Sequence, residues 1–139
     1  MTRYKINIEY DGTNLVGWQK QKNGLSIQEI LENSLYKLSG EKETIQGSGR
    51  TDAGVHALNQ VGHFDLHKKI KTDAIRDGLN FHIKNLYKKY NVSVLKCQKT
   101  KKILMLDLML KKELIYIKYL IGDRLLQFKI KESGMLKKS

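Results

Sequence analysis

Proline is absent from this sequence of 139 residues, and cysteine occurs once, at position 97. A lone cysteine excludes an internal disulfide framework and a zinc site built from several cysteines. The first residues, MTRYKINIEYDG, contain no apolar segment of the kind that directs secretion. No window approaches the roughly eighteen consecutive apolar residues of a membrane-spanning helix. We therefore expect neither a secreted nor a membrane protein, and we expect a cytoplasmic location.

Negative charge is also scarce, because 14 Asp and Glu residues face 26 Lys and Arg residues and leave a net charge of +12. A basic excess favours RNA or DNA, which bind through phosphate contacts and counterion release. Most of the basic residues are lysines, which a coding preference for A-rich codons would also produce. Charge alone therefore leaves both explanations open. The hydrophobic fraction of 40% is enough for the packed core of one domain.

The composition changes near residue 100, although no linker-like segment marks the change. Residues 101–139 are rich in Leu and Ile but contain no Val, Ala, Thr or Asn. We therefore predict a folded domain at residues 1–98 and a divergent basic tail at residues 99–139.

Hydrophobic periodicity predicts the element order strand, helix, strand, strand, helix, strand. Tyr4, Ile6, Ile8 and Tyr10 alternate with polar residues, as in a half-buried strand. A capping box of Ser26 and Glu29 opens a helix with one apolar face, which ends at Gly40. The other predicted elements are strands at 44–46, 61–66 and near 92–94, and a helix from Thr72 to about Asn80 capped by Thr72. This order is that of the split βαβ, ferredoxin-like α+β fold.

The densest chemical segment is GSGRTDAGVHA at residues 47–57, where three glycines allow sharp turns or close approach of a ligand. It contains one guanidinium, Arg50, and one carboxylate, Asp52. An arginine can hold a carboxylate ionised and can contact phosphate, and such a carboxylate can act as nucleophile or base on a sugar ring. The alternative is that Asp52 only caps a turn and Arg50 only pairs with it.

A second segment, YDGTNLVGWQKQ at residues 10–21, carries aromatic and amide groups suited to base stacking and hydrogen bonding. The alternative for Trp18 is that it packs into the core. His63 and His67 stand four residues apart, but they fall on a predicted strand and its basic end, so we reject a metal site there. We interpret His56 as a structural hydrogen bonder.

Together, YDGTNLVGWQKQ and GSGRTDAGVHALNQVGHFD resemble the N-terminal half of the tRNA pseudouridine synthase A family. The resemblance runs from Tyr4 to about Val94. It implies a catalytic α+β fold with a mixed or antiparallel sheet, no cofactor, no metal and a homodimer. It also implies an isomerase with tRNA as its partner, which converts uridine to pseudouridine in the anticodon stem-loop, at tRNA positions 38 to 40.

The resemblance implies roles for individual residues. Asp52 matches the family's essential carboxylate, which acts as nucleophile or base, and Arg50 matches the arginine that pairs with it and holds the target nucleotide out of the stack. The other residues that we assign to substrate binding are Tyr10, Asp11, Gly12, Trp18, Gln19, Thr51 and His56.

After Lys96 the family pattern disappears. Read one base out of register, plausible codons for residues 103–119 spell S-H-A-R-F-D-A-K-K-R-T-Y-I-Y-K-I, which restores the family motif with its base-stacking tyrosine. We therefore expect a frameshift near Lys99–Lys102 and a truncated chain with little or no activity. The alternatives are a short paralogue with a divergent tail, a non-catalytic basic RNA-binding module and a pseudogene product.

Overall fold

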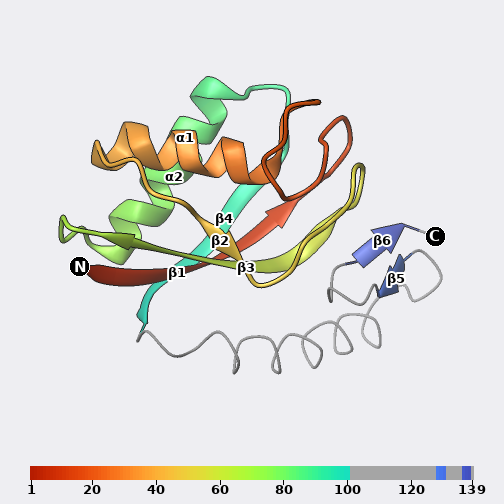
Figure 1. The fold of residues 1–139 in the computed structure, drawn as a ribbon. Coiled ribbons are helices and arrows are strands. Elements are labelled where there is room, and N and C mark those ends of the chain that lie inside the picture. Colours follow the sequence, from red (N-terminus) through yellow and green to blue (C-terminus); the bar gives the residue numbers. More distant parts are fainter. Residues whose placement is uncertain (101–127, 131–135, 139) are drawn as a thin grey trace.

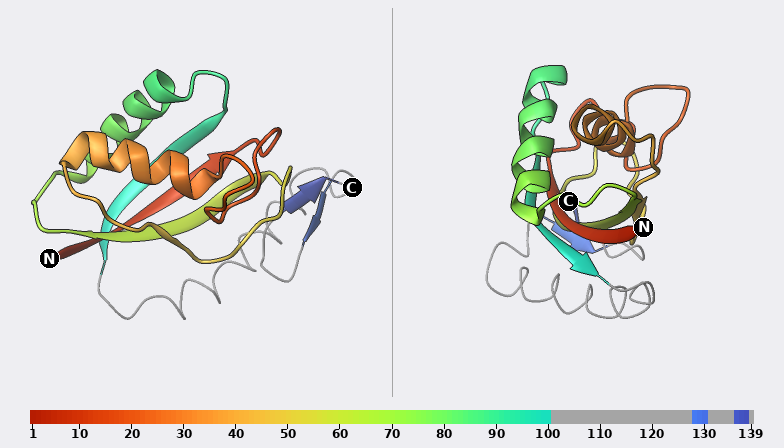
Figure 2. Two further views of the ribbon diagram at one scale, coloured as in Figure 1. Left: turned by 45° about the horizontal axis from the view of Figure 1, so that its top comes forward. Right: turned by 90° about the vertical axis from the view of Figure 1, so that its left-hand side faces the viewer.

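The computed structural model describes residues 1–100, 128–130 and 136–138, which form a four-stranded antiparallel sheet, two helices and a short separate hairpin. Both helices cover the same face of the sheet (Figures 1 and 2). Among the described residues, neither helix combines the length and apolar composition that a membrane span requires. Most of the predicted tail, including residues 103–119 where a shifted reading frame is predicted, lies outside the described residues. In chain order the elements are β1 (Thr2–Tyr10), α1 (Ile27–Ser39), β2 (Gln46–Gly47), β3 (Ala57–Leu66), α2 (Thr72–Leu86), β4 (Val92–Thr100), β5 (Phe128–Ile130) and β6 (Leu136–Lys138).

The sheet has the strand order β2-β3-β1-β4, so β1 lies between two long neighbours. Both neighbours run antiparallel to it, with Ile6 opposite Gly62 on β3 and opposite Cys97 on β4. Helix α1 connects β1 to β2 and helix α2 connects β3 to β4, and both crossovers place their helix on the same face of the sheet. This arrangement confirms the predicted ferredoxin-like α+β fold.

The helix-facing side of β1 supplies the centre of the core. Tyr4, Ile6, Ile8 and Tyr10 are all at most 3% exposed, which confirms the predicted alternation. The hydroxyl of Tyr4 also donates to the carbonyl of Ile70 at 3.1 Å, and this bond fixes the chain just before α2. Strand β1 therefore contributes the centre of the apolar core and also holds the segment that leads into α2.

Helix α1 begins and ends where its capping residues predict. The Ser26 hydroxyl accepts a hydrogen bond from the N–H of Glu29 at 3.1 Å, and Gly40 takes a left-handed conformation with φ of 76°. The Ser26 oxygen gives a partner to a backbone N–H of the first turn, and the left-handed Gly40 lets its own N–H bond to the Tyr36 carbonyl in the last turn. The apolar stripe of the helix is buried at Ile27, Ile30, Leu31 and Leu35.

Four features of the element boundaries differ from the predicted ones. Helix α2 continues to Leu86, because Ile75, Leu79 and Ile83 extend its buried stripe at helical spacing. Its N-cap is Lys71, without a side-chain bond, so the prediction that Thr72 caps the helix is wrong. Strand β3 starts at Ala57 instead of 61, and β2 lies at Gln46–Gly47 instead of 44–46.

Strand β4 forms an edge of the sheet, and a side chain of α2 occupies part of that edge. The Asn80 amide donates to the carbonyl of Val94 at 2.9 Å and accepts from the N–H of Val94 at 2.8 Å. The pairing with β1 is irregular at this point, where the register shifts between Asn7 and Ile8. Asn80 therefore gives Val94 the two bonds that a further strand would provide, and it ties α2 to the sheet.

We expect Asn80→Ala to lower the free energy of unfolding by about 1–3 kcal/mol, because both backbone groups of Val94 lose their partner. Urea denaturation measures this change. The matched control is Asn85→Ala, at an exposed position of the same helix, which should change stability by less than about 0.5 kcal/mol. Equal effects of the two substitutions would contradict the assigned role of Asn80.

Candidate active site

The loop between β2 and β3 carries both groups to which the sequence assigned chemistry. Arg50 and Asp52 are exposed, whereas Thr51 between them is buried at 6% exposure. The Asp52 carbonyl accepts a hydrogen bond from Val55 N–H at 3.2 Å, and Gly54 takes a left-handed φ of 77°. This tight turn directly follows the carboxylate and returns the chain to β3. The loop therefore presents a guanidinium and a carboxylate to solvent from a defined backbone.

The loop that follows β1 packs against this turn through its backbone. Trp18 N–H donates to the Thr51 carbonyl at 3.2 Å, and Gly54 N–H donates to the Leu15 carbonyl at 3.1 Å. A Cβ atom at Gly12 would collide with the carbonyl of Val55, and one at Gly17 would collide with the carbonyl of Thr51. Gly17 also has a φ of 106°. Two of the sequence's glycines are thus required by close approach of the two loops.

Four of the predicted substrate-binding residues are buried: Tyr10, Gly12, Trp18 and Thr51. Tyr10 and Trp18 are each 3% exposed, and the Tyr10 hydroxyl lies 3.0 Å from the Thr51 hydroxyl. Burial raises the pKa of Tyr10, so its hydroxyl stays protonated. The Trp18 indole covers Gly47, where a Cβ would come within 2.7 Å of the ring. The alternative that Trp18 packs into the core is therefore confirmed.

Gln60 also supports the loop, and sequence reasoning missed it. Its side chain is fully buried on β3 and donates to the Gly49 carbonyl at 2.7 Å. Among the described residues, Gln60 Oε1 and the buried hydroxyl of Ser48 have no hydrogen-bond partner. Gln60 is separated from Phe64 and Leu66 by even numbers of residues, so on an extended strand it falls on the same core face. A polar residue on that face would have indicated a structural role. It was overlooked because the predicted strand began only at Val61.

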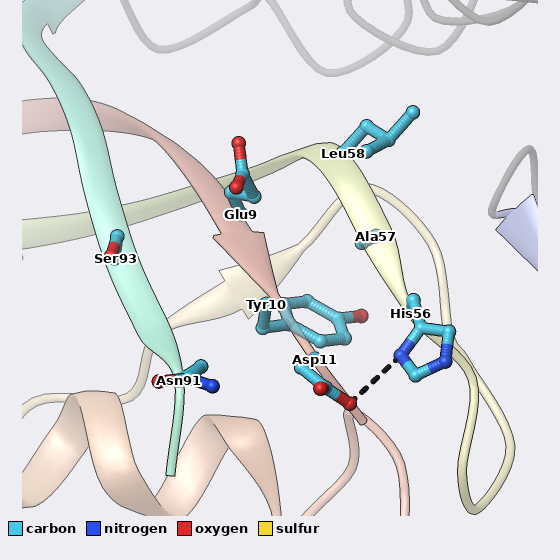
Figure 3. Close-up of a pocket in the computed structure, with 8 residues that line it drawn as sticks. All are labelled: Glu9, Tyr10, Asp11, His56, Ala57, Leu58, Asn91 and Ser93. Carbon is cyan, nitrogen blue, oxygen red and sulfur yellow. Dashed lines mark ion pairs between the residues drawn. The ribbon is translucent and has the colours of Figure 1, made fainter. Parts of the chain in front are cut away.

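A pocket of about 430 Å³ opens where β1 ends and β3 and β4 begin. It brings together Tyr10, Asp11 and His56, and Figure 3 shows the Asp11 carboxylate directed at the imidazole of His56. The residues that line it do not include Arg50, Thr51 or Asp52, nor Gly12, Trp18 or the exposed Gln19. The described lining residues are Glu9, Tyr10, Asp11, His56, Ala57, Leu58, Asn91 and Ser93.

The imidazole of His56 joins the two loops through one ring nitrogen. Its Nδ1 lies 3.0 Å from the backbone nitrogen of Gly12 and 3.0 Å from Oδ1 of Asp11. A ring nitrogen carries either a lone pair or a proton, so it can accept from Gly12 or donate to Asp11 but cannot do both. Either bond holds the loop after β1 against the start of β3. This agrees with the interpretation of His56 as a structural hydrogen bonder.

Asp11 is held in its ionised form by its own loop. Its Oδ1 accepts from the Thr13 hydroxyl at 2.6 Å and from Thr13 N–H at 2.9 Å. These bonds, with a smaller contribution from the charge of His56, lower the pKa of Asp11.

One group of described residues has the composition of a cation site, and it lies away from these loops. Ligand atoms of Glu41, Glu43 and His67 are within 4.8 Å of one another, beyond the C-terminal end of β3. The Glu41 carboxylate already accepts the N–H groups of His67 and Lys68, at 2.9 and 3.1 Å. His63, the other half of the rejected pair, is buried at 6% exposure, and burial lowers its pKa.

Comparison with known proteins identifies relatives of this chain. A family model described as tRNA pseudouridine synthase matches residues 6–103. The tRNA pseudouridine synthase A of Beijerinckia indica is 54% identical over 84 residues, which are 60% of this chain and 32% of the relative. The proteins of the same name from Ehrlichia ruminantium and Wolbachia pipientis wMel are 57% identical over 82 residues and 53% over 85. These matches cover 58% and 60% of this chain, and 33% and 35% of the relatives. The chain thus spans about a third of the length of the curated relatives it matches.

The lowered pKa of Asp11 predicts a pH-dependent contribution to stability. Because the folded pKa lies below the unfolded value, Asp11 stabilises the protein above the usual carboxyl pKa near 4, and this contribution is lost as pH falls through the folded pKa. At neutral pH, Asp11→Asn should lower the free energy of unfolding by less than about 1 kcal/mol, since the side chain is half-exposed. Urea denaturation at several pH values should show this difference shrinking in acid.

An NMR titration of Asp11 tests whether the hydrogen bonds from Thr13 cause the lowered pKa of Asp11. Thr13→Val removes the hydroxyl donor and should raise the titration midpoint of Asp11. Thr44→Val, the same change at an exposed position, should leave that midpoint where it is. An unchanged midpoint in Thr13→Val would show that Thr13 is not the cause.

Proposed function

Because this chain belongs to the tRNA pseudouridine synthase family, we propose that its Arg50–Asp52 loop serves the isomerisation of uridine to pseudouridine in tRNA. The observation that carries the proposal is the exposure of Arg50 and Asp52 on a backbone whose flanking groups are hydrogen-bonded. A carboxylate that acts on a bound nucleotide must be accessible and must also be held in a fixed orientation. The loop meets both requirements.

The reaction conserves every atom of the nucleotide. The N1–C1′ bond breaks, the uracil turns and the C5–C1′ bond forms, after which C5 loses its proton and N1 gains one. Asp52 acts on the ribose in one of two ways: it attacks C1′ as a nucleophile, or it removes the C2′ proton as a base. Either step requires an ionised carboxylate, and we assign to Arg50 the pairing with it.

The substrate we assign is the anticodon stem-loop of tRNA. A glycosidic bond inside a helical stem is reached only when the nucleotide is turned out of the stack, and we assign the holding of that nucleotide to Arg50. Residues 1–100 contain 16 Lys and Arg against 10 Asp and Glu, and this net charge of +6 supports a polyanionic partner. We assign further contacts with the RNA to Asp11, His56 and the exposed Gln19, and we place the protein in the cytoplasm. The homodimer that the family resemblance implies is assigned to the frame-restored enzyme and not to the 139-residue chain.

We further propose that residues 1–98 form the family domain and that residues 99–139 are a tail in a shifted reading frame. The family match ends at residue 103, and the apolar composition changes at the same region. On this proposal, the tyrosine that stacks on the target base and the opposite wall of the cleft are missing from the chain. The activity then belongs to the frame-restored enzyme.

In the frame-restored enzyme, Asp52→Ala should abolish the release of tritium from C5-labelled uridine in tRNA, because no other group takes the role of the carboxylate. Binding of tRNA should change by less than about twofold, since the basic surface is retained. Asp77→Ala, at an exposed carboxylate of α2, is the matched control and should turn over normally. Normal turnover by Asp52→Ala would refute the catalytic assignment.

The 139-residue chain itself should show little or no tritium release from the same tRNA. The gene should contain an A-rich run at the codons for Lys99–Lys102, and one inserted or removed base there should open a frame encoding H-A-R-F-D-A. Sequencing of the locus checks this directly. Early stop codons in that frame, or robust turnover by the 139-residue chain, would instead favour a divergent short synthase.

A further inference from the structure

Exposure alternates sharply along the loop that carries the reactive pair. Arg50 and Asp52 are exposed, while Thr51 between them turns into the core with 6% of its surface accessible. The buried Thr51 side chain therefore fixes the peptide unit that precedes Asp52. Whatever fixes Thr51 also fixes the direction in which the Asp52 side chain leaves the backbone.

The partner of the Thr51 side chain is Tyr10. The two hydroxyls lie 3.0 Å apart in a buried contact, and either can be the donor. Tyr10 is the last residue of β1 and stands opposite Ala57, the first residue of β3. A tyrosine side chain has only two rotatable bonds, so a ring packed at the end of a central strand forms a rigid support for Thr51.

The backbone of Thr51 is bonded as well. Its carbonyl accepts the N–H of Trp18, and two residues beyond Asp52 the N–H of Gly54 bonds to the Leu15 carbonyl. On the other side of Arg50, Gln60 holds the carbonyl of Gly49. Of these supports, only the contact between Tyr10 and Thr51 uses two side-chain hydroxyls that can each be removed while the shape of the side chain is kept.

We propose that Tyr10 is a positioning residue, which acts through the Thr51 hydroxyl to set the orientation of Asp52 and does not itself touch the tRNA. With 3% of its surface exposed, the Tyr10 side chain offers very little area for contact with a bound nucleotide. Its role in the reaction rests on the proposed function of Asp52. Its role in holding the loop does not, and the two can be tested separately.

Amide hydrogen exchange on the 139-residue chain tests the holding of the loop. Tyr10→Phe and Thr51→Val each remove one hydroxyl with little change of shape. Each should make the amides of Trp18 and Gly54 exchange about fivefold faster, as expected for loss of one buried hydrogen bond. If the two residues act through one bond, the double variant should exchange no faster than the faster single variant. Thr51→Ser, which keeps the hydroxyl, should retain the slow exchange.

Two controls separate a local effect from general destabilisation. Tyr36→Phe makes the same chemical change at an exposed tyrosine of α1 and should leave the exchange of both amides unchanged. The amides of Leu31 and Leu35, in the buried stripe of α1, should keep their rates in all variants. Unchanged exchange at Trp18 and Gly54 in both Tyr10→Phe and Thr51→Val, or an equal increase throughout α1, would overturn the proposal.

Turnover by the frame-restored enzyme tests the consequence for catalysis. Tyr10→Phe and Thr51→Val should lower kcat at least about tenfold and leave KM within about twofold, because Asp52 is misdirected while tRNA contacts are kept. Thr51→Ser, which keeps the hydroxyl, should have the kcat of the unsubstituted enzyme. A raised KM with normal kcat would instead make Tyr10 a binding residue. If the unsubstituted enzyme releases no tritium, the proposed function fails, and the exchange experiment still decides whether Tyr10 holds the loop.

Discussion

The loop after β1 and the loop before β3 approach each other so closely that two positions accept no side chain. At Gly12 and Gly17 a Cβ atom would meet backbone carbonyls of Val55 and Thr51, which cannot move aside as a flexible side chain would. The polar contacts around Asp52 follow from this approach. The bonds from Trp18 to Thr51 and from Gly54 to Leu15 both cross the same interface.

The sheet supplies the frame that brings these loops together. Because β1 and β3 are antiparallel neighbours, the C-terminal end of β1 and the N-terminal end of β3 lie at the same end of the sheet. Cross-strand polar pairs fix their register on the face opposite the helices: Arg3 pairs with Asp65 at 2.8 Å, and Asn7 bonds to Asn59 at 2.9 Å. A slip of one residue would exchange these pairs with the apolar residues of the core, so the register and the loop geometry are specified together.

The sequence predicts well those features that depend on local pattern. The alternation along β1, the serine cap of α1 and the glycine at its end each reflect a few neighbouring residues, and all three are confirmed. The extent of α2 and the start of β3 were missed because packing against distant elements decides them. The sequence indicated the burial of Tyr10 through the alternation along β1 and offered core packing as the alternative for Trp18, but it gave no sign that Thr51 is buried. Gln60 was missed because a buried amide is recognised only once its strand has been assigned to a face.

Within the described part of the chain, the hydrogen-bonding and packing supports named above for the Arg50–Asp52 loop precede Leu66. Tyr10, Gly12, Trp18 and Gln60 belong to the first elements, and β4 adds to the opposite side of β1. Synthesis on the ribosome proceeds from the N-terminus, so each of these named supports emerges from the exit tunnel before α2 does. The loop can therefore assemble while later codons are still being read. A change of reading frame beyond that point alters the remainder of the polypeptide but leaves the information for this part of the molecule intact.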